Sequence, residues 1–153
     1  MVHIIGVDHI IQHDGWIEPK KETAIREFQR YLHNQVRLTG ATMIAEEFSE
    51  DAITLSHASM STVAEVAAEL GLRHLFFDPG RAERLRRGIS TAIQRECYWL
   101  EQLSPFRAEE IIFVCGDSHV TSFSSILAQN EWEHEILSEG WGRNLDLSRE
   151  DAS

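Results

Sequence analysis

The sequence predicts an α/β fold with a mostly parallel central sheet of about four to five strands and helices on both faces. Short apolar runs alternate with longer amphipathic stretches, which is the pattern of successive βαβ units. The chain has 153 residues, of which 42% are hydrophobic and 25% are charged, as in an ordinary globular domain. A chain of this length can bury a core without disulfides, so we expect a single domain over residues 1–153.

The first half of the chain is predicted to alternate strands and helices. Strands are expected at 2–7, 41–45 and 73–77, and helices at 23–38 and 62–70. The first of these helices places Ile25, Phe28 and Leu32 at steps of three and four, so they share one face. The second is expected to begin with a capping box formed by Thr62 and Glu65.

The second half continues this alternation and ends in a polar tail. We expect a long helix at 81–103, a strand at 111–115, a helix at 118–129, an edge strand at 135–137 and a frayed tail at 143–153. The long helix carries an apolar stripe that includes Leu85, Ile93 and Leu100. Trp132 and Trp141 flank the edge strand and are expected to pack on the sheet or on a second subunit, which leaves a homo-oligomer open.

The charge of the chain narrows the choice of partner. Fourteen basic and twenty-five acidic residues give a net charge of −11, which excludes a general nucleic-acid binder and argues against docking on anionic membranes. The basic charge is concentrated, because six arginines and two acidic residues lie between residues 73 and 95. We therefore expect a small-molecule partner, and an anionic one fits this segment.

The cysteine count and the hydropathy predict a cytoplasmic protein. The two cysteines are far apart and belong to no ligand motif, which fits a reducing compartment. No apolar run reaches the length of about 18 residues that a membrane span requires. The first residues lack the basic region and the cleavage site of a signal peptide.

Polar side chains follow each predicted strand at the point where it ends. They are Asp8 and His9 after the first strand, Glu46 and Glu47 after the second, Asp78 after the third, and Asp117, Ser118 and His119 after the fourth. Ligands of open α/β sheets bind beyond the carboxyl ends of the strands, where these residues should meet. Some have an ordinary structural alternative, because Asp117 or Ser118 can cap the next helix and Asp78 fits an Asp-Pro-Gly turn.

A Gly-x-x-His pattern occurs twice, each time at the end of an apolar run. The first copy places Gly6 before His9, and the second places Gly116 before His119. A glycine at such a position allows the backbone to approach a ligand closely. The repeated pattern therefore predicts that both histidines reach the same edge of the sheet.

These motifs resemble those of the TraB/ChaN-like superfamily, which includes the erythromycin esterases and the Tiki proteases. The resemblance spans residues 2 to about 128, and this chain is shorter than most members. In that superfamily two Gly-x-x-His motifs occur together with a glutamate at the end of the second strand and an arginine on a central helix. The resemblance implies that His9, His119, Arg95 and either Glu46 or Glu47 form a catalytic site. Glu46 is favoured because it lies nearest the strand.

One hypothesis for the function is a hydrolase, in two versions. In the first version a histidine is the general base for water, the glutamate orients it, and Arg95 holds an anionic or carbonyl group. In the second version His9, Glu46 and His119 bind a divalent ion, zinc or manganese, that activates the water. No other cofactor is expected.

The other hypothesis is a non-enzymatic module that binds a small anion or a protein partner in the same cleft. Residues expected to contact the bound molecule under either hypothesis are Asp8, Asp78, Arg81, Asp117 and Ser118. Arg81 is included because it begins a helix directly after the Asp-Pro-Gly turn, so it can face the strand ends.

Overall fold

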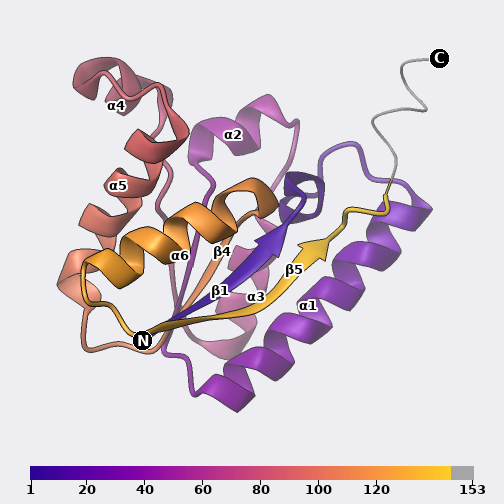
Figure 1. The fold of residues 1–153 in the computed structure, drawn as a ribbon. Coiled ribbons are helices and arrows are strands. Elements are labelled where there is room, and N and C mark those ends of the chain that lie inside the picture. The colour runs from indigo at the N-terminus through magenta and orange to yellow at the C-terminus, as the bar shows by residue number, and fades with distance from the viewer. Residues whose placement is uncertain (146–153) are drawn as a thin grey trace.

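The computed structural model describes residues 1–145 and contains one five-stranded sheet in which every strand is parallel to its neighbours (Figure 1). The strand order is β3-β2-β4-β1-β5. The strands are β1 (Val2–Val7), β2 (Met43–Glu46), β3 (Arg73–Phe76), β4 (Ile111–Gly116) and β5 (His134–Trp141). The predicted α/β class and the parallel sheet are confirmed.

Helices cover both faces of this sheet, with α1 and α3 on one face and α5 and α6 on the other (Figure 1). The α-helices are α1 (Pro19–Thr39), α2 (Glu50–Leu55), α3 (Thr62–Leu70), α4 (Arg81–Arg87), α5 (Ala92–Leu103) and α6 (Val120–Gln129). Short 3-10 turns occupy η1 (His9–Gln12), η2 (Ser104–Phe106) and η3 (Asp117–His119).

The two faces of the sheet bury separate apolar clusters, as the alternation of side chains along a strand requires. Within β2, Met43 and Ala45 pack toward α5 and α6, whereas Ile44 packs toward α1 and α3. Trp99 anchors the first cluster and Phe28 the second, and both are fully buried. This alternation matters for the site, because it continues past the end of β2.

The carboxyl ends of β1 and β4 lie beside each other where the chain connections diverge. From β1 the chain runs through α1 to β2, which lies beyond β4, and from β4 it runs through α6 to β5, which lies beyond β1. The two connecting helices cover opposite faces. In open α/β sheets, ligands usually bind outside the carboxyl ends of the strands at such a divergence.

The predicted long helix at 81–103 is wrong, because the chain breaks between α4 and α5. Gly88 ends α4 in the left-handed conformation at φ 66°, and Thr91 then begins α5 with a capping box that includes Gln94. The predicted apolar stripe is consequently not a buried face, since Leu85 is 76% exposed and Ile93 is 65% exposed.

Several element boundaries also differ from the prediction. The cap of α3 is Ser61, whose side chain accepts the Ala64 N–H, and not Thr62. The expected helix at 118–129 starts as the 3-10 turn η3, and β5 is longer than the predicted strand at 135–137. Helix α2 and the turn η1 were not expected.

Both tryptophans near β5 pack within their own chain. Trp132 belongs to the buried cluster beside α6, and Trp141 packs at a tilt against Phe28 and Tyr31, with ring centroids 5.6 and 4.6 Å away. Residues 142–144 form a hydrogen-bonded turn, and the last part of the tail that was expected to fray, 146–153, lies outside the described residues. Within residues 1–145, none of the helices has the length and apolar character that crossing a membrane requires.

Candidate functional site

Glu47 lies at the centre of a buried polar cluster at the carboxyl edge of the sheet. It follows β2 directly, and its backbone N–H donates to Val114 O at 2.8 Å, so it continues the line of the strand. Its side chain is 1% exposed. Oε1 accepts the Gly116 N–H at 2.8 Å, and Oε2 accepts a hydrogen bond from the Arg95 guanidinium. These donors replace the water that a buried carboxylate loses.

Two histidine rings approach Glu47 from the neighbouring strands β1 and β4. Nε2 of His9 lies 3.5 Å from Glu47 Oε1, and Nε2 of His119 lies 3.3 Å from Oε2. The two rings differ in accessibility, because the His9 side chain is 49% exposed and the His119 side chain only 7%. The histidines of the paired motifs thus meet at one carboxylate, and His9 is the one that a substrate can reach.

Arg95 is held between two carboxylates. Its Nε donates to Asp78 Oδ1 at 2.9 Å, while its Nη2 donates to Glu47. Asp78 also accepts hydrogen bonds from Arg84 at 2.5 Å and from the Trp99 indole at 3.2 Å. The guanidinium is therefore fixed in position while 22% of its side chain stays exposed.

A second buried carboxylate, that of Glu96, lies behind His119. Its Oε2 accepts hydrogen bonds from His119 Nδ1 at 2.7 Å and from Ser122 Oγ at 2.8 Å. The ring of His119 thus has a carboxylate at each nitrogen, Glu96 at Nδ1 and Glu47 at Nε2, and a protonated imidazole can donate to both. Glu96 Oε1 is buried and has no hydrogen-bond partner among the residues that the structure describes.

The cluster shifts the pKa values of Glu47 and His119 in opposite directions. Burial alone would raise the pKa of Glu47, but the hydrogen bond from His119, the charges of His9 and Arg95 and the Gly116 N–H outweigh it and lower that pKa. The hydrogen bond to Glu47 raises the pKa of His119 against the opposing effect of burial, and Glu96 adds to the increase. Both shifts favour an ionised Glu47 beside a protonated His119.

This pair is expected to make stability depend on pH at both ends of the range. The folded pKa of His119 lies above its ordinary 6.5, so its stabilising contribution is complete below that value and is lost as the pH rises through the folded pKa. The folded pKa of Glu47 lies below its ordinary 4.5, so its contribution is complete above 4.5 and is lost as the pH falls through the folded pKa.

Denaturant unfolding of the wild type and of His119→Gln, from about pH 5 to about pH 9, checks the alkaline half of this prediction. The wild type is expected to be the more stable protein at the acidic end, and its advantage should shrink as the pH rises. An advantage that stays constant over the whole range would contradict the prediction.

The glycine of the second motif is required for close approach. A Cβ atom added to Gly116 would lie 2.8 Å from His9 Nε2 and 3.3 Å from Glu47 Oε1. Its φ of −60° is open to any residue, so the reason for glycine here is space and not backbone conformation. Gly116 lets the histidine and the carboxylate meet directly over the end of β4.

Glu46 points to the opposite face of the sheet from Glu47 and does not join this cluster. It is fully buried, and its carboxylate accepts hydrogen bonds from Gln12 at 3.1 Å, from Ser61 at 2.5 Å and from His74 at 2.5 Å. The geometry therefore places Glu47, and not the favoured Glu46, beside both histidines. Successive residues at a strand end face opposite sides, and only Glu47 faces the side of α5.

The residues expected to bind substrate are divided by the structure. Asp78 contacts Arg95 directly, as described above, and Arg81 begins α4, where its backbone N–H donates to Asp51. Asp8 caps η1, and Asp117 accepts hydrogen bonds from Gly140 N at 2.8 Å and from Arg143 at 3.0 Å, which ties β5 to η3. Ser118 is exposed. Only Asp78 touches the cluster around Glu47.

The donors expected for a metal ion are not assembled. The set was His9, Glu46 and His119, but both carboxylate oxygens of Glu46 are engaged on the other face of the sheet. Across residues 1–145 there is no group of three histidine, cysteine, aspartate or glutamate side chains arranged to hold a metal ion. The residues therefore do not fit the metal-assisted version of the hydrolase hypothesis.

A cavity of about 380 Å³ adjoins the cluster between α2 and α4. Asp78, Arg81 and Arg84 line it together with the apolar side chains of Leu55 and Leu85. Two of the residues expected to bind substrate, Asp78 and Arg81, therefore line this cavity, and Asp78 is also the carboxylate that holds Arg95.

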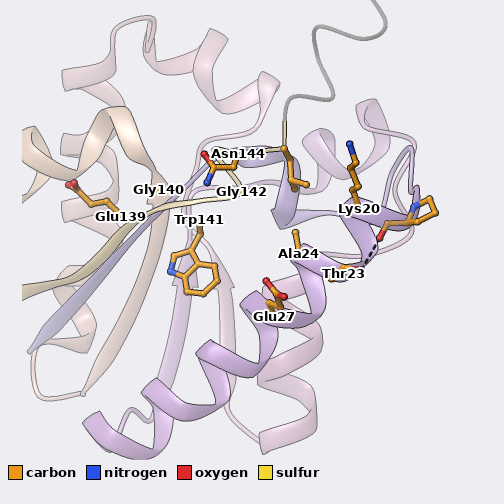
Figure 2. A pocket seen from close by; sticks show the side chains of 11 residues that line it. Lys20, Thr23, Ala24, Glu27, Glu139, Gly140, Trp141, Gly142 and Asn144 are labelled. Carbon is orange, nitrogen blue, oxygen red and sulfur yellow. Dashed lines mark hydrogen bonds between the residues drawn. The ribbon is translucent and has the colours of Figure 1, made fainter.

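A larger cavity of about 700 Å³ lies elsewhere, between the start of α1 and the end of β5 (Figure 2). Lys20, Glu27, Glu139, Trp141 and Asn144 are among its lining residues, as Figure 2 shows. No residue of the cluster around Glu47 lines it, so size alone does not identify the site.

Four polar side chains that contact His9, Glu46 or Glu96 were missed by the sequence reasoning. They are Gln12, Ser61, His74 and Ser122. Gln12 had a signal, since it stands three residues after His9 and neighbours it on one helical turn. The others had none, because their places depend on how α3, β3 and α6 pack on the sheet.

Comparison with known proteins gives no relative for this chain. No family model matches it, and neither a curated protein nor a solved structure does.

Proposed function

We propose that the chain is a hydrolase of a small ester, amide or phosphoester, with His9 as its general base. The observation that carries the proposal is the meeting of His9, Glu47, Arg95 and His119 at the carboxyl edge of the sheet, where β1 and β4 are neighbours. A half-exposed imidazole backed by a buried carboxylate is suited to taking a proton from water. The likeness of the paired motifs to the TraB/ChaN-like superfamily supports the same reading, and we propose the chain as a short member.

In the proposed reaction, water attacks the carbonyl carbon or the phosphorus of the substrate while Nε2 of His9 takes one proton from it. The bond to the leaving group then breaks, and the imidazolium returns that proton to the leaving oxygen or nitrogen. Glu47, 3.5 Å from Nε2, stabilises the imidazolium between these two steps. His119 and Arg95 keep the carboxylate ionised for this role.

Arg95 is the group placed to interact with the negative charge that develops on the substrate. Its hydrogen bonds to described residues use Nε and Nη2, and part of the side chain is exposed. The cavity beside Asp78 offers room for a substituent of the substrate, and Arg81 and Arg84 on its wall favour an anionic one. The substrate class that fits best is therefore a small anionic ester, amide or phosphoester.

The test is a hydrolysis panel of chromogenic esters, amides and phosphoesters, run with the wild type and with His9→Ala/His119→Ala. His33→Ala is the matched control, because His33 is paired with Glu69 on the surface, away from the cluster. We expect turnover by the wild type and by the control, and a loss of about 10²–10⁴-fold in kcat/KM in the double variant.

The outcome also separates the two hypotheses for this cleft. Turnover that survives in the double variant would overturn the assignment of His9. If the wild type hydrolyses nothing but binds an anion of the panel with an affinity that requires His9, the chain is a binding module and not an enzyme.

A further inference from the structure

A series of hydrogen bonds connects the half-exposed His9 to the buried Glu46 across the edge of the sheet. Nδ1 of His9 lies 2.5 Å from Gln12 Oε1, and Gln12 Nε2 donates to Glu46 Oε1 at 3.1 Å. Gln12 and Glu46 are both fully buried. The half-exposed imidazole is therefore linked through Nδ1 to Gln12, and through Gln12 to Glu46, neither of which solvent reaches.

The groups around Gln12 Nε2 determine which way the Gln12 amide is oriented, and so the direction of these hydrogen bonds. Gln12 Nε2 faces two groups, Glu46 Oε1 and the backbone oxygen of Glu47 at 3.3 Å. An ionised carboxylate and a carbonyl can only accept hydrogen bonds, so the NH₂ end of the amide must point at them. The oxygen end must then face His9, and an oxygen requires a donor on Nδ1.

Glu46 is itself held by donors that oppose its rotation. Ser61 Oγ donates to its Oε2 at 2.5 Å, and His74 Nε2 lies 2.5 Å from the same atom. Ser61 is fixed in turn as the cap of α3. The Glu46 end of this series of hydrogen bonds is thus anchored on both α3 and β3.

We propose that Glu46 and Gln12 are positioning residues, which keep the ring proton of His9 on Nδ1 and leave Nε2 as its reactive nitrogen. Glu46 acts on the site without touching it, because its carboxylate orients the amide and the amide orients the ring. The arrangement mirrors the one at His119, where Glu96 accepts the hydrogen bond from Nδ1 directly. That the tautomer matters for turnover rests on the proposed function, whereas the tautomer itself does not.

The direct test is the ¹⁵N NMR spectrum of the His9 ring, which distinguishes a protonated from an unprotonated nitrogen. The resonances are assigned by their loss in His9→Ala, and a pH series gives the neutral ring at its alkaline limit. In the wild type we expect the proton on Nδ1. In Glu46→Gln the end residue can also donate, so only the longer bond to the Glu47 carbonyl, at 3.3 Å, still orients the Gln12 amide, and the population of Nε2–H should rise.

A paired exchange separates this role from a merely structural one. In Gln12→Glu/Glu46→Gln the new Glu at position 12 accepts from His9, and the new Gln at position 46 donates to it and still accepts from Ser61. The bonds that link His9, position 12, position 46 and Ser61 can then be kept, and only the 3.3 Å bond to the Glu47 carbonyl is lost, so the Nδ1 tautomer should return. Gln29→Leu is the control, because Gln29 bonds to the Thr62 carbonyl and to Glu65, away from His9.

The activity measurement completes the test. Glu46→Gln is expected to lower kcat/KM by about 10- to 100-fold, and the paired exchange to restore most of it. A wild-type ring protonated on Nε2, or a tautomer that does not change in folded Glu46→Gln, would overturn the inference. An Nδ1 tautomer in a wild type without turnover would instead overturn the proposed function and leave the positioning role intact.

Discussion

Glu47→Gln is expected to lower the free energy of unfolding by about 3 kcal/mol or more, because it removes one partner of a buried ionic cluster. The amide would leave Arg95 and His119 facing a neutral group in a place where water cannot replace the lost charge. It would also turn an acceptor into a donor beside the Gly116 N–H or the guanidinium. Urea unfolding near neutral pH measures the effect.

Glu22→Gln is the matched control for this substitution. Glu22 makes an ion pair with Arg26 on the surface of α1, where both side chains are at least half exposed. Such pairs contribute about 0–1 kcal/mol, so the control should be close to the wild type. Equal effects of the two substitutions would show that the cluster around Glu47 does not act as a buried ionic unit.

Gly116→Ala is expected to reduce kcat/KM by about 100-fold while changing stability little. The added Cβ would lie within 2.8 Å of His9 Nε2, and the half-exposed imidazole can swing outward to avoid it. A general base displaced by about 1 Å loses its alignment with the attacking water. Steady-state kinetics on the best substrate of the panel, together with a melting curve, measures both quantities.

The glycine of the first motif provides the contrast. A Cβ on Gly6 would lie 2.6 Å from Asp117 Oδ1 and 2.8 Å from Val120 Cγ2, inside the packed layer under α6. Gly6→Ala should therefore cost about 1–3 kcal/mol of stability through overpacking. A stable Gly116→Ala protein with full turnover would show that the contact with His9 has no catalytic role.

The strands could be predicted from sequence because their signals are local. The run at residues 2–7 coincides with β1, and the run at 111–115 lacks only the last residue of β4. The interruption of the helix at 81–103 was missed, although Gly88 and Thr91 are ordinary end and start signals. Leu85 and Ile93 continue the apolar periodicity of a single helix across the break between α4 and α5, although both side chains are exposed.

The candidate site was predicted in its histidines and its arginine, but the choice between the two glutamates was not. Alternation along β2 puts Glu46 on the side of Ile44 and Glu47 on the side of Ala45. That parity is visible in the sequence. The sequence does not show on which face of the sheet Arg95 lies. That depends on the face that α5 covers, and no local signal specifies it.

The pairing of β1 with β4, in which Val2 is opposite Ile111, has a consequence during synthesis. The first strand leaves the ribosome long before its partner on either side, because β4 and β5 are both made late. Until then a six-residue apolar segment has unpaired backbone groups on both edges, a state that invites aggregation. Delayed collapse or chaperone protection would limit that risk, and the two histidines can meet only after β4 and η3 have been made.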